Sequence, residues 1–422
     1  MLEKYFLKPQ TVDRFRALWL GQEIERYVVW LSEQGYADRT VLRRVPLLAG
    51  FAEFARANGA ATVEDLPSHV GAFVAGWLER WRPVRGVDSA SQVAKEARGP
   101  IEQWLELVVP GFNGTGRPHL KDPFVEALPE FFEHLVAERG LRPATIRLYQ
   151  HYLHRFSAYL DRIGVSKLAD LSPTLLSAFV AERAASGLAR TTVRGTCGVL
   201  RVFLRYAHRE GLVPSDLSKA VEWPQAYRLS TIPRSISWDD VGKVLECVDR
   251  RTPSGKRDYA ILLLLVTYGL RSREIAALTL DDIDWKRERL SIPERKGGQS
   301  SAFPLSTSVG GALVDYLRYG RPQTKERQVF LRAVAPFRPV GSAAVSAQAT
   351  HYLRKAGVDV IRPGSHTLRH TCVQRLVDAS FALKTIGDFI GHRSPASTMI
   401  YSKVAVDSLR QVALGDGEEV LR

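Results

Sequence analysis

The sequence predicts a mainly α-helical chain with a small antiparallel β-sheet, built as two related helical modules followed by a larger segment that contains the sheet. Three observations support this fold class. Apolar residues recur every three or four positions through much of the chain, which is the period of an amphipathic helix. Two stretches resemble each other at an offset of 105 residues. Beyond Ser237, the pattern changes to helix, short strands and more helix.

Length and composition limit the class of protein. A chain of 422 residues exceeds the roughly 250 to 300 residues at which one hydrophobic core stops growing, so two or three domains are expected. The longest apolar run, Ala260 to Val266, is too short to span a membrane, and the N-terminus MLEKYFLKPQ does not resemble a signal peptide. Three widely spaced cysteines without a CxxC pair predict a cytoplasmic protein without a structural zinc site.

The charge of the chain favours a polyanionic partner. The sequence has 59 Lys and Arg against 45 Asp and Glu, a net charge of +14. Residues 1–120 contain 15 basic and 14 acidic side chains, residues 121–236 contain 16 and 11, and residues 237–422 contain 28 and 20. The excess lies in the last two thirds of the chain, and it favours nucleic acid as the partner.

Stretches rich in proline and glycine mark the boundaries between the parts. Val109 to Pro123 contains too much Gly and Pro to be helical, and Pro224 and Pro233 flank a second polar stretch. The predicted organisation is an N-terminal helical module at 1–110, a linker at 111–123, a second helical module at 124–222, a linker at 223–236 and a last domain at 237–422.

The two helical modules share a pattern that needs no gap to align. In each copy a helix ends at a glycine, a second apolar-periodic helix follows, and a polar loop leads to an Asp-Leu pair. Pro46, opposite His151, fits poorly inside the second helix of the first copy. The matching positions are Gly35, Thr40, Leu48, Phe51, Gly59, Asp65 and Leu66 in the first copy, and Gly140, Thr145, Leu153, Phe156, Gly164, Asp170 and Leu171 in the second.

The second module continues into a basic helix at Thr191 to Arg209. Its apolar residues form one stripe, which predicts a buried side, and its arginines occupy much of the remaining surface. Such a helix can present guanidinium groups to phosphates, so this module is the one expected to bind DNA. The arginines are Arg194, Arg201, Arg205 and Arg209.

The last domain begins with a helix at Ser237 and contains a second, buried helix over Asp258 to Tyr268. Gly269 provides the left-handed residue that ends such helices. Arg271 follows, and Ser272 is predicted to cap a short helix after it. Arg271 is therefore expected near the positive end of that helix, a position suited to an anion.

A β-hairpin is predicted next, with strands at Leu290 to Ile292 and Ala302 to Leu305. Lys296 lies in the loop PERKGGQSS that joins them. Two glycines follow Lys296 and leave the backbone bare, so its amine could reach into a cleft.

The stretch GSHTLRHTCVQRL holds a histidine and an arginine at helical spacing. Ser365 is predicted to cap a helix on which His366 and Arg369, three residues apart, share a face. His370 suggests a metal ligand, but the glutamate of an HExxH motif is missing and no third ligand is evident. The group better suits a phosphodiester, because arginine has a permanent charge and imidazole can move a proton near neutral pH.

The last motif is IGDFIGHRSPASTMIYSKV. It places His392 in a Gly-His turn and Tyr401 nine residues later. Tyr401 is the candidate nucleophile, because Arg271, Lys296, His366, Arg369 and His392 together supply what phosphoryl transfer to a tyrosine needs.

These motifs, GLRSREI, the hairpin KGGQSSAFPL, HTLRH, and IGH with its later tyrosine, resemble the tyrosine recombinase family of phage integrases and Xer-type recombinases. The resemblance covers about Phe124 to the C-terminus. It implies that the second module is a SAM-like core-binding domain and that the last segment is the catalytic domain. The implied roles are phosphate neutralisation by Arg271 and Arg369, general acid for Lys296, general base for His366, phosphate contact for His392 and nucleophile for Tyr401.

The resemblance implies a site-specific DNA recombinase or integrase, of a mobile element, that forms a covalent 3′-phosphotyrosine on double-stranded DNA and needs neither metal nor ATP. A type IB topoisomerase-like strand relaxer and an inactive DNA-binding relative remain alternatives. A metal nuclease would need clustered carboxylates, and Asp281, Asp282 and Asp284 are expected in a solvated loop.

A homo- or hetero-tetramer is expected through a C-terminal helix with Val404, Leu409 and Val412. The N-terminal module is expected to contact protein or clamp outer DNA.

Overall fold

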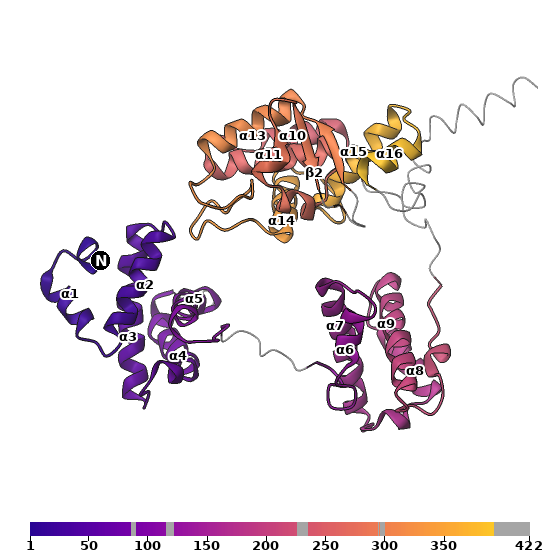
Figure 1. The fold of residues 1–422 in the computed structure, drawn as a ribbon, viewed down its shortest axis with the longest axis horizontal. Helices are drawn as coiled ribbons and strands as arrows, with labels where there is room; N and C mark the ends of the chain where they lie inside the picture. Colours follow the sequence, from indigo (N-terminus) through magenta and orange to yellow (C-terminus); the bar gives the residue numbers. More distant parts are fainter. Residues whose placement is uncertain (86–89, 115–121, 226–234, 294, 296–299, 392–422) are drawn as a thin grey trace, which may run out of the picture. The chain divides into compact units, whose positions relative to one another are not determined.

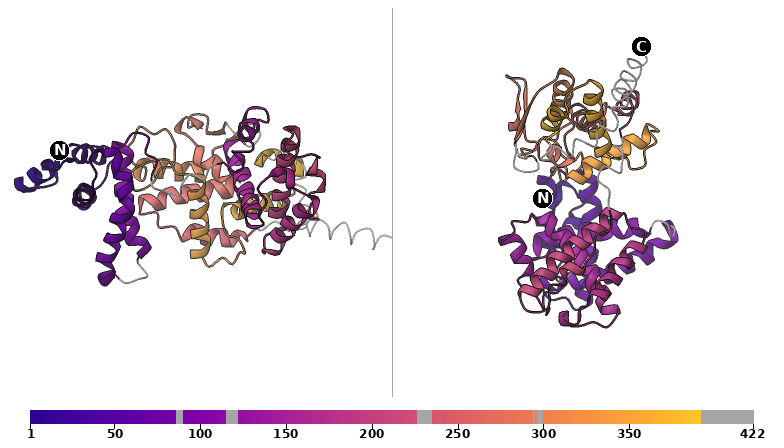
Figure 2. Two further views of the ribbon diagram at one scale, coloured as in Figure 1. Left: turned by 90° about the horizontal axis from the view of Figure 1, so that it is seen from below. Right: turned by 90° about the vertical axis from the view of Figure 1, so that its right-hand side faces the viewer.

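The computed structural model describes residues 1–85, 90–114, 122–225, 235–293, 295 and 300–391. Helices predominate in every part of the chain, and the strands form a single small sheet in the described residues (Figures 1 and 2). The mainly α fold class with a small antiparallel sheet is thus confirmed. Residues 122–225 belong to a compact unit that is distinct from the rest. No described helix is long and apolar enough to cross a membrane.

The first module, residues 1–114, packs its helices around one apolar cluster that includes Leu48, Phe51 and Trp104, each fully buried. Pro46 lies inside the third helix, which continues through it. Pro46 and Leu42 are both exposed, so the carbonyl that loses its donor faces solvent and the helix tolerates the proline. The elements are η1 (Leu2–Lys4), α1 (Pro9–Arg16), α2 (Gly21–Glu33), α3 (Asp38–Ala57), η2 (Val63–Asp65), α4 (Leu66–Arg85) and α5 (Ala90–Val108).

The second module, residues 122–225, has its own core of aromatic rings. Phe203 packs edge-on to Phe131 with ring centroids 5.4 Å apart, and Phe156 lies 5.1 Å from Phe179. The elements are α6 (Phe131–Ala137), α7 (Pro143–Arg162), η4 (Leu168–Asp170), α8 (Pro173–Ala185), α9 (Arg190–Arg209) and η5 (Leu217–Ala220).

The two modules repeat the same local geometry. Helices α3 and α7 each have 20 residues, and the short helices η2 and η4 end at Asp65 and Asp170. Each of the paired glycines, Gly35 with Gly140 and Gly59 with Gly164, has a positive φ. A left-handed residue costs glycine little, so these positions let the chain reverse after a helix.

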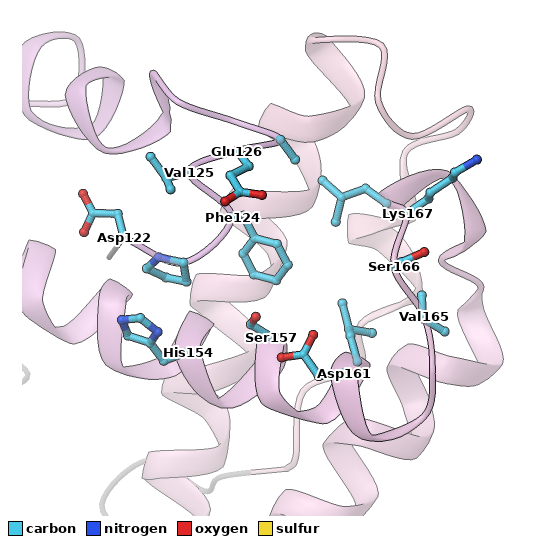
Figure 3. A pocket seen from close by; sticks show the side chains of 14 residues that line it. Asp122, Phe124, Val125, Glu126, His154, Ser157, Asp161, Val165, Ser166 and Lys167 are labelled. Atoms are coloured by element: carbon cyan, nitrogen blue, oxygen red, sulfur yellow. The ribbon is translucent and has the colours of Figure 1, made fainter. Parts of the chain in front are cut away.

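The second module also contains an open pocket with a volume of about 410 Å³. His154, Ser157 and Asp161 of α7 line one side of it, and Phe124 precedes α6 on another (Figure 3). None of the expected catalytic residues that the structure describes lines this pocket.

The C-terminal segment, residues 235–391, is built around α11 (Pro253–Tyr268), which contacts α13 (Thr307–Tyr319) and α15 (Ser365–Asp378). Thr252 caps α11 through the Gly255 N–H, and Gly269 ends it with φ 58°. The predicted buried helix is confirmed, because leucines occupy every side of α11. The other helices are α10 (Trp238–Glu246), α12 (Ser272–Ala277), η6 (Leu280–Asp282), α14 (Ser342–Lys355) and α16 (Leu383–Ile390).

The sheet has the antiparallel order β1 (Ile283–Asp284), β2 (Arg289–Ile292) and β3 (Ser301–Pro304). Leu290 pairs with Phe303, and both side chains are buried. The predicted hairpin is confirmed, with its second strand beginning and ending one residue earlier than expected. The loop PERKGGQSS connects the two strands of the hairpin, and its Lys296 lies outside the described residues.

Candidate active site

Arg271 lies at the N-cap of α12 and is held there by Glu274. The backbone N–H of Arg271 donates to Glu274 Oε2 at 2.8 Å, and Arg271 Nη1 donates to Glu274 Oε1 at 2.8 Å. Its remaining terminal nitrogen, Nη2, donates to the carbonyl of Gly391 at 3.0 Å. The guanidinium group is therefore oriented by a carboxylate on one side and by the end of α16 on the other.

The two predicted serine caps are wrong. The N-cap of α12 is Arg271, and the N-cap of α15 is Gly364. Ser272 and Ser365 are instead the first helical residues, and the Ser272 hydroxyl donates to Ser365 Oγ at 2.6 Å. The two hydroxyls join α12 to α15, and Glu274 takes the capping role at the start of α12.

Arg369 lies on α15 and is almost completely buried, with 5% of its surface exposed. Its Nη1 donates to the carbonyl of Gly269, and its Nη2 donates to the carbonyl of Ile390 at 2.7 Å. Arg271 and Arg369 are far apart in sequence, yet they donate to the adjacent carbonyls Gly391 and Ile390. The structure thus brings both arginines to the C-terminal end of α16.

His366 belongs to the same group but is exposed. Partial desolvation of the ring lowers its pKa from the usual 6.5, and the positive charges of Arg369 and Arg271 lower it further. The imidazole is therefore largely neutral at pH 7 and can accept a proton. His370 has its ring centroid 6.4 Å from that of His366, and burial lowers its pKa to about 4.

Lys296, His392 and Tyr401 lie outside the described residues. The structure therefore places Arg271, His366 and Arg369 together and leaves these other three as predictions.

Two further residues of this region were missed by sequence reasoning. Glu274 is buried, and its carboxylate accepts from Arg271 and from Arg295 Nε. Burial acts to raise the pKa of Glu274, but the Arg271 backbone N–H and the charges of Arg295 and Arg271 outweigh it and lower the pKa. The spacing of Glu274, three residues after the N-cap, is a signal that could have identified it. Arg295 had no such signal, because an arginine in a polar loop predicts a solvated charge.

The carboxylates near the hairpin have structural contacts. Asp282 accepts from the Thr279 N–H at 2.8 Å, Asp284 accepts from two turn N–H groups, and Asp281 pairs with Arg327. Across the described ranges, no three His, Cys, Asp or Glu side chains are arranged to hold a metal ion.

The comparisons with known proteins identify the class of this chain. Residues 234–407 match the model of the phage integrase family, and residues 128–211 match that of the phage integrase N-terminal SAM-like domain. The relative y4rA of Sinorhizobium fredii, named as an integrase/recombinase, is 33% identical over 92% of this chain and 92% of its own length. The tyrosine recombinase XerD of Mycobacterium tuberculosis is 29% identical over 68% of this chain and 96% of its own length.

Solved structures share the fold. The XerH site-specific recombinase, solved on a palindromic difH substrate after cleavage, has a TM-score of 0.54 at 16% identity and covers 83% of this chain and 96% of its own. A lambda integrase fragment, solved as a dimer on a COC′ core site, has a TM-score of 0.52 at 18% identity and covers 65% of this chain and 94% of its own.

The family models and the named relatives define the class of this chain as a tyrosine recombinase. The chain belongs to the phage integrase family of tyrosine recombinases, which includes the Xer-type enzymes. The predicted family, enzyme class and site-specific DNA recombinase function are confirmed.

Proposed function

We propose that this recombinase serves a mobile element and that Arg271, Lys296, His366, Arg369, His392 and Tyr401 carry out its strand cleavage. The mobile-element role is supported by the relatives named integrase/recombinase and by a fold match to a transposon integrase, Tn1549, with a TM-score of 0.51. The catalytic assignment is supported by one observation above all. Arg271 and Arg369 converge on the adjacent carbonyls of Gly391 and Ile390.

The two arginines suit the scissile phosphate. Phosphoryl transfer depends on positioning and on neutralising charge at the non-bridging oxygens, and guanidinium groups present planar donors for those oxygens. Arg271 is held by Glu274 and is 22% exposed at its side chain, so it can reach a ligand. Two buried or half-buried guanidinium groups at one place supply this neutralisation without a metal.

The chemical step balances without an external energy source. The Tyr401 oxygen forms a bond to phosphorus while the bond from phosphorus to the 5′ oxygen breaks. His366, neutral at pH 7, takes the tyrosine proton, and Lys296 gives a proton to the departing 5′ oxygen. His392 donates to the phosphate. The 3′-phosphotyrosine keeps the bond energy, so a 5′ hydroxyl can reverse the step without ATP.

The second module is proposed to bind the DNA backbone through α9. Val193, Leu200 and Phe203 bury one side of this helix. On the other side, the guanidinium groups of Arg194 and Arg201 lie 5.1 Å and 4.5 Å from the centroid of the Trp223 ring. Stacking on the indole restricts both arginines, which lowers the entropy they lose on binding phosphate.

Assembly on DNA is proposed to use more than one copy of the chain. One solved relative of this fold is a lambda integrase tetramer bound to a Holliday junction, with a TM-score of 0.53. The apolar residues Val404, Leu409 and Val412 lie outside the described residues, and we propose that they dock on a neighbouring protomer. The first module is proposed to contact protein or outer DNA. The domain boundaries and the cytoplasmic location predicted from sequence stay predictions.

Covalent trapping tests the proposed function. The full-length protein is incubated with a library of nicked duplexes, in which the short 5′-hydroxyl strand diffuses away after cleavage, and adducts are counted on denaturing gels with EDTA present. Wild type is expected to form an adduct, and Tyr401→Phe is expected to bind DNA equally and form none, because only the hydroxyl is removed. An undiminished adduct in Tyr401→Phe would disprove the assigned nucleophile.

The same preparation separates the alternatives. A topoisomerase-like relaxer would relax supercoiled plasmids of any sequence and form adducts without site preference. An inactive relative would bind DNA but form no adduct with any duplex. Cleavage that requires Mg²⁺ and survives Arg271→Ala and Arg369→Ala would favour a metal nuclease.

A further inference from the structure

Arg295 is a buried arginine that joins three parts of the C-terminal segment. Only 1% of its surface is exposed, the lowest of the buried charged residues in the described chain. Nε donates to Glu274 Oε1 at 3.3 Å, and Nη1 donates to Ser301 Oγ at 3.1 Å. Nη1 also donates to the carbonyl of Phe389 at 2.9 Å, and Nη2 donates to that of Ile390 at 2.8 Å. One guanidinium group therefore connects α12, β3 and the end of α16.

The acceptors of Arg295 are also those of the two phosphate-binding arginines. Glu274 Oε1 receives hydrogen bonds from both Arg295 and Arg271. The carbonyl of Ile390 receives hydrogen bonds from both Arg295 and Arg369. Arg295 therefore shares one hydrogen-bond acceptor with Arg271 and another with Arg369.

The arrangement has a clear electrostatic basis. The last carbonyls of a helix lack intrahelical donors and carry the negative end of the helix dipole, so cations are stabilised there. A charge as deeply buried as Arg295 also needs a paired carboxylate, which Glu274 supplies. Gly391 allows the close approach, because a Cβ at this position would lie 2.8 Å from Arg295 Cζ and its φ is 66°.

We propose that Arg295 is a positioning residue that fixes Glu274 and the end of α16, and through them holds Arg271 and Arg369 in the geometry that binds the scissile phosphate. It does not touch the phosphate, because its side chain is enclosed and four of its five N–H groups are directed at protein acceptors. This inference rests on the proposed roles of Arg271 and Arg369.

The test compares two substrates in the full-length protein. Single-turnover adduct formation is measured with a normal scissile phosphodiester and with a methylphosphonate, in which one charged oxygen is replaced by a neutral methyl group. Removing groups that neutralise phosphate charge should harm the diester far more than the methylphosphonate. Arg295→Met keeps the length of the side chain but removes its donors. It is expected to slow diester cleavage by about 10- to 100-fold, as is typical when partners that orient functional groups are lost.

Arg257→Met is the matched control. Arg257 is another buried arginine of this segment, 7% exposed, and it pairs with Asp258 and the carbonyl of Leu331. If Arg257→Met slows cleavage, it should slow cleavage of the diester and of the methylphosphonate by the same factor. Arg295→Met should instead lower the ratio of the diester rate to the methylphosphonate rate, as Arg271→Ala does. Arg295→Lys keeps a charge beside Glu274 and serves if Arg295→Met does not fold; it should change the ratio in the same direction by less.

The outcomes are distinguishable. A folded Arg295 variant with wild-type diester rates, or with equal losses on both substrates as for Arg257→Met, would overturn the inference. If wild type forms no adduct with either substrate, the proposed function fails first. A changed ratio in both Arg295→Met and Arg271→Ala, with the control ratio unchanged, would establish the positioning role.

Discussion

The two helical modules have matching scaffolds and different surfaces. Leu48 and Phe51 of α3 are fully buried, and so are their counterparts Leu153 and Phe156 of α7. The last α-helix of each module differs in charge. Helix α9 of the second module has five arginines and no carboxylate, whereas helix α5 of the first module has Lys95 and Arg98 against three glutamates. Buried apolar positions therefore specify the scaffold, and the surface charges decide which copy suits a polyanion.

The contacts of these basic side chains sharpen the difference. In α5, Arg98 lies 3.8 Å from Glu102 on the same helix. In α9, Arg194 and Arg201 stack on Trp223, and Arg205 donates to the backbone carbonyl of Arg201. No carboxylate within α9 competes with phosphate for these groups.

The largest effect is expected from substitutions that create cavities in the apolar cores of the two helical modules. Leu153→Ala and Leu48→Ala each remove a fully buried side chain, which typically costs about 2 to 5 kcal/mol of stability. If only the second module binds DNA near the cleavage site, Leu153→Ala should abolish adduct formation at temperatures where its module unfolds. Leu48→Ala should lose a similar amount of stability yet keep cleavage of the nicked substrate near wild type.

Thermal unfolding and adduct yield, measured on the same samples, check this pair. Equal loss of cleavage in both variants would mean that the first module contributes directly to the active site, and the division of roles between the modules would be wrong.

Sequence reasoning predicted those elements whose signals are local. The buried helix α11 follows from its leucines and from Gly269, and the hairpin follows from its two short apolar runs. The two serine caps are wrong because Ser272 and Ser365 are the first residues of their helices; their hydroxyls bond to each other instead, a contact between segments that no local pattern reveals. Arg295 was missed for the same reason, since its partners come from distant parts of the chain.

The next largest effect, on the salt dependence of DNA binding, is expected when arginines of α9 lose their charge. Arg194 and Arg205 are both exposed, and replacing both with glutamine should remove two phosphate contacts. The slope of log binding constant against log salt should become less steep by about 1.8, because each phosphate contact contributes about 0.9 on duplex DNA. The control is Lys95→Gln with Arg98→Gln on α5, which should leave the slope unchanged. Fluorescence anisotropy across a salt series would measure both, and equal changes would show that both modules bind the backbone.

Removing the Trp223 ring should have a smaller effect on DNA binding. The change releases the side chains of Arg194 and Arg201 from the ring but leaves their charge unchanged. Each cation–π contact at an exposed site is worth about 0.5 to 1 kcal/mol. Two such contacts are lost, which corresponds to about 1 to 2 kcal/mol, so Trp223→Ala should weaken DNA binding by at most about 5- to 30-fold with little change in the salt slope. Trp285→Ala is the matched control, since the two rings are 41% and 43% exposed. A slope that fell as in the arginine variants would mean that the arginines no longer contact phosphate at all.

The smallest expected effect comes from releasing one arginine in each module from its carboxylate. Arg209 Nε donates to Glu210 at 2.9 Å, and Arg98 lies 3.8 Å from Glu102. Surface pairs of this kind contribute little to stability, so Glu210→Gln and Glu102→Gln should leave unfolding unchanged. Glu210→Gln should steepen the salt slope by at most about 0.9, because Arg209 keeps Glu138 at 3.6 Å as a competing partner. Glu102→Gln should not change the slope, because α5 is not expected to lie on DNA. Steepening in Glu102→Gln alone would reverse the assignment and make the first module the one that follows the DNA backbone.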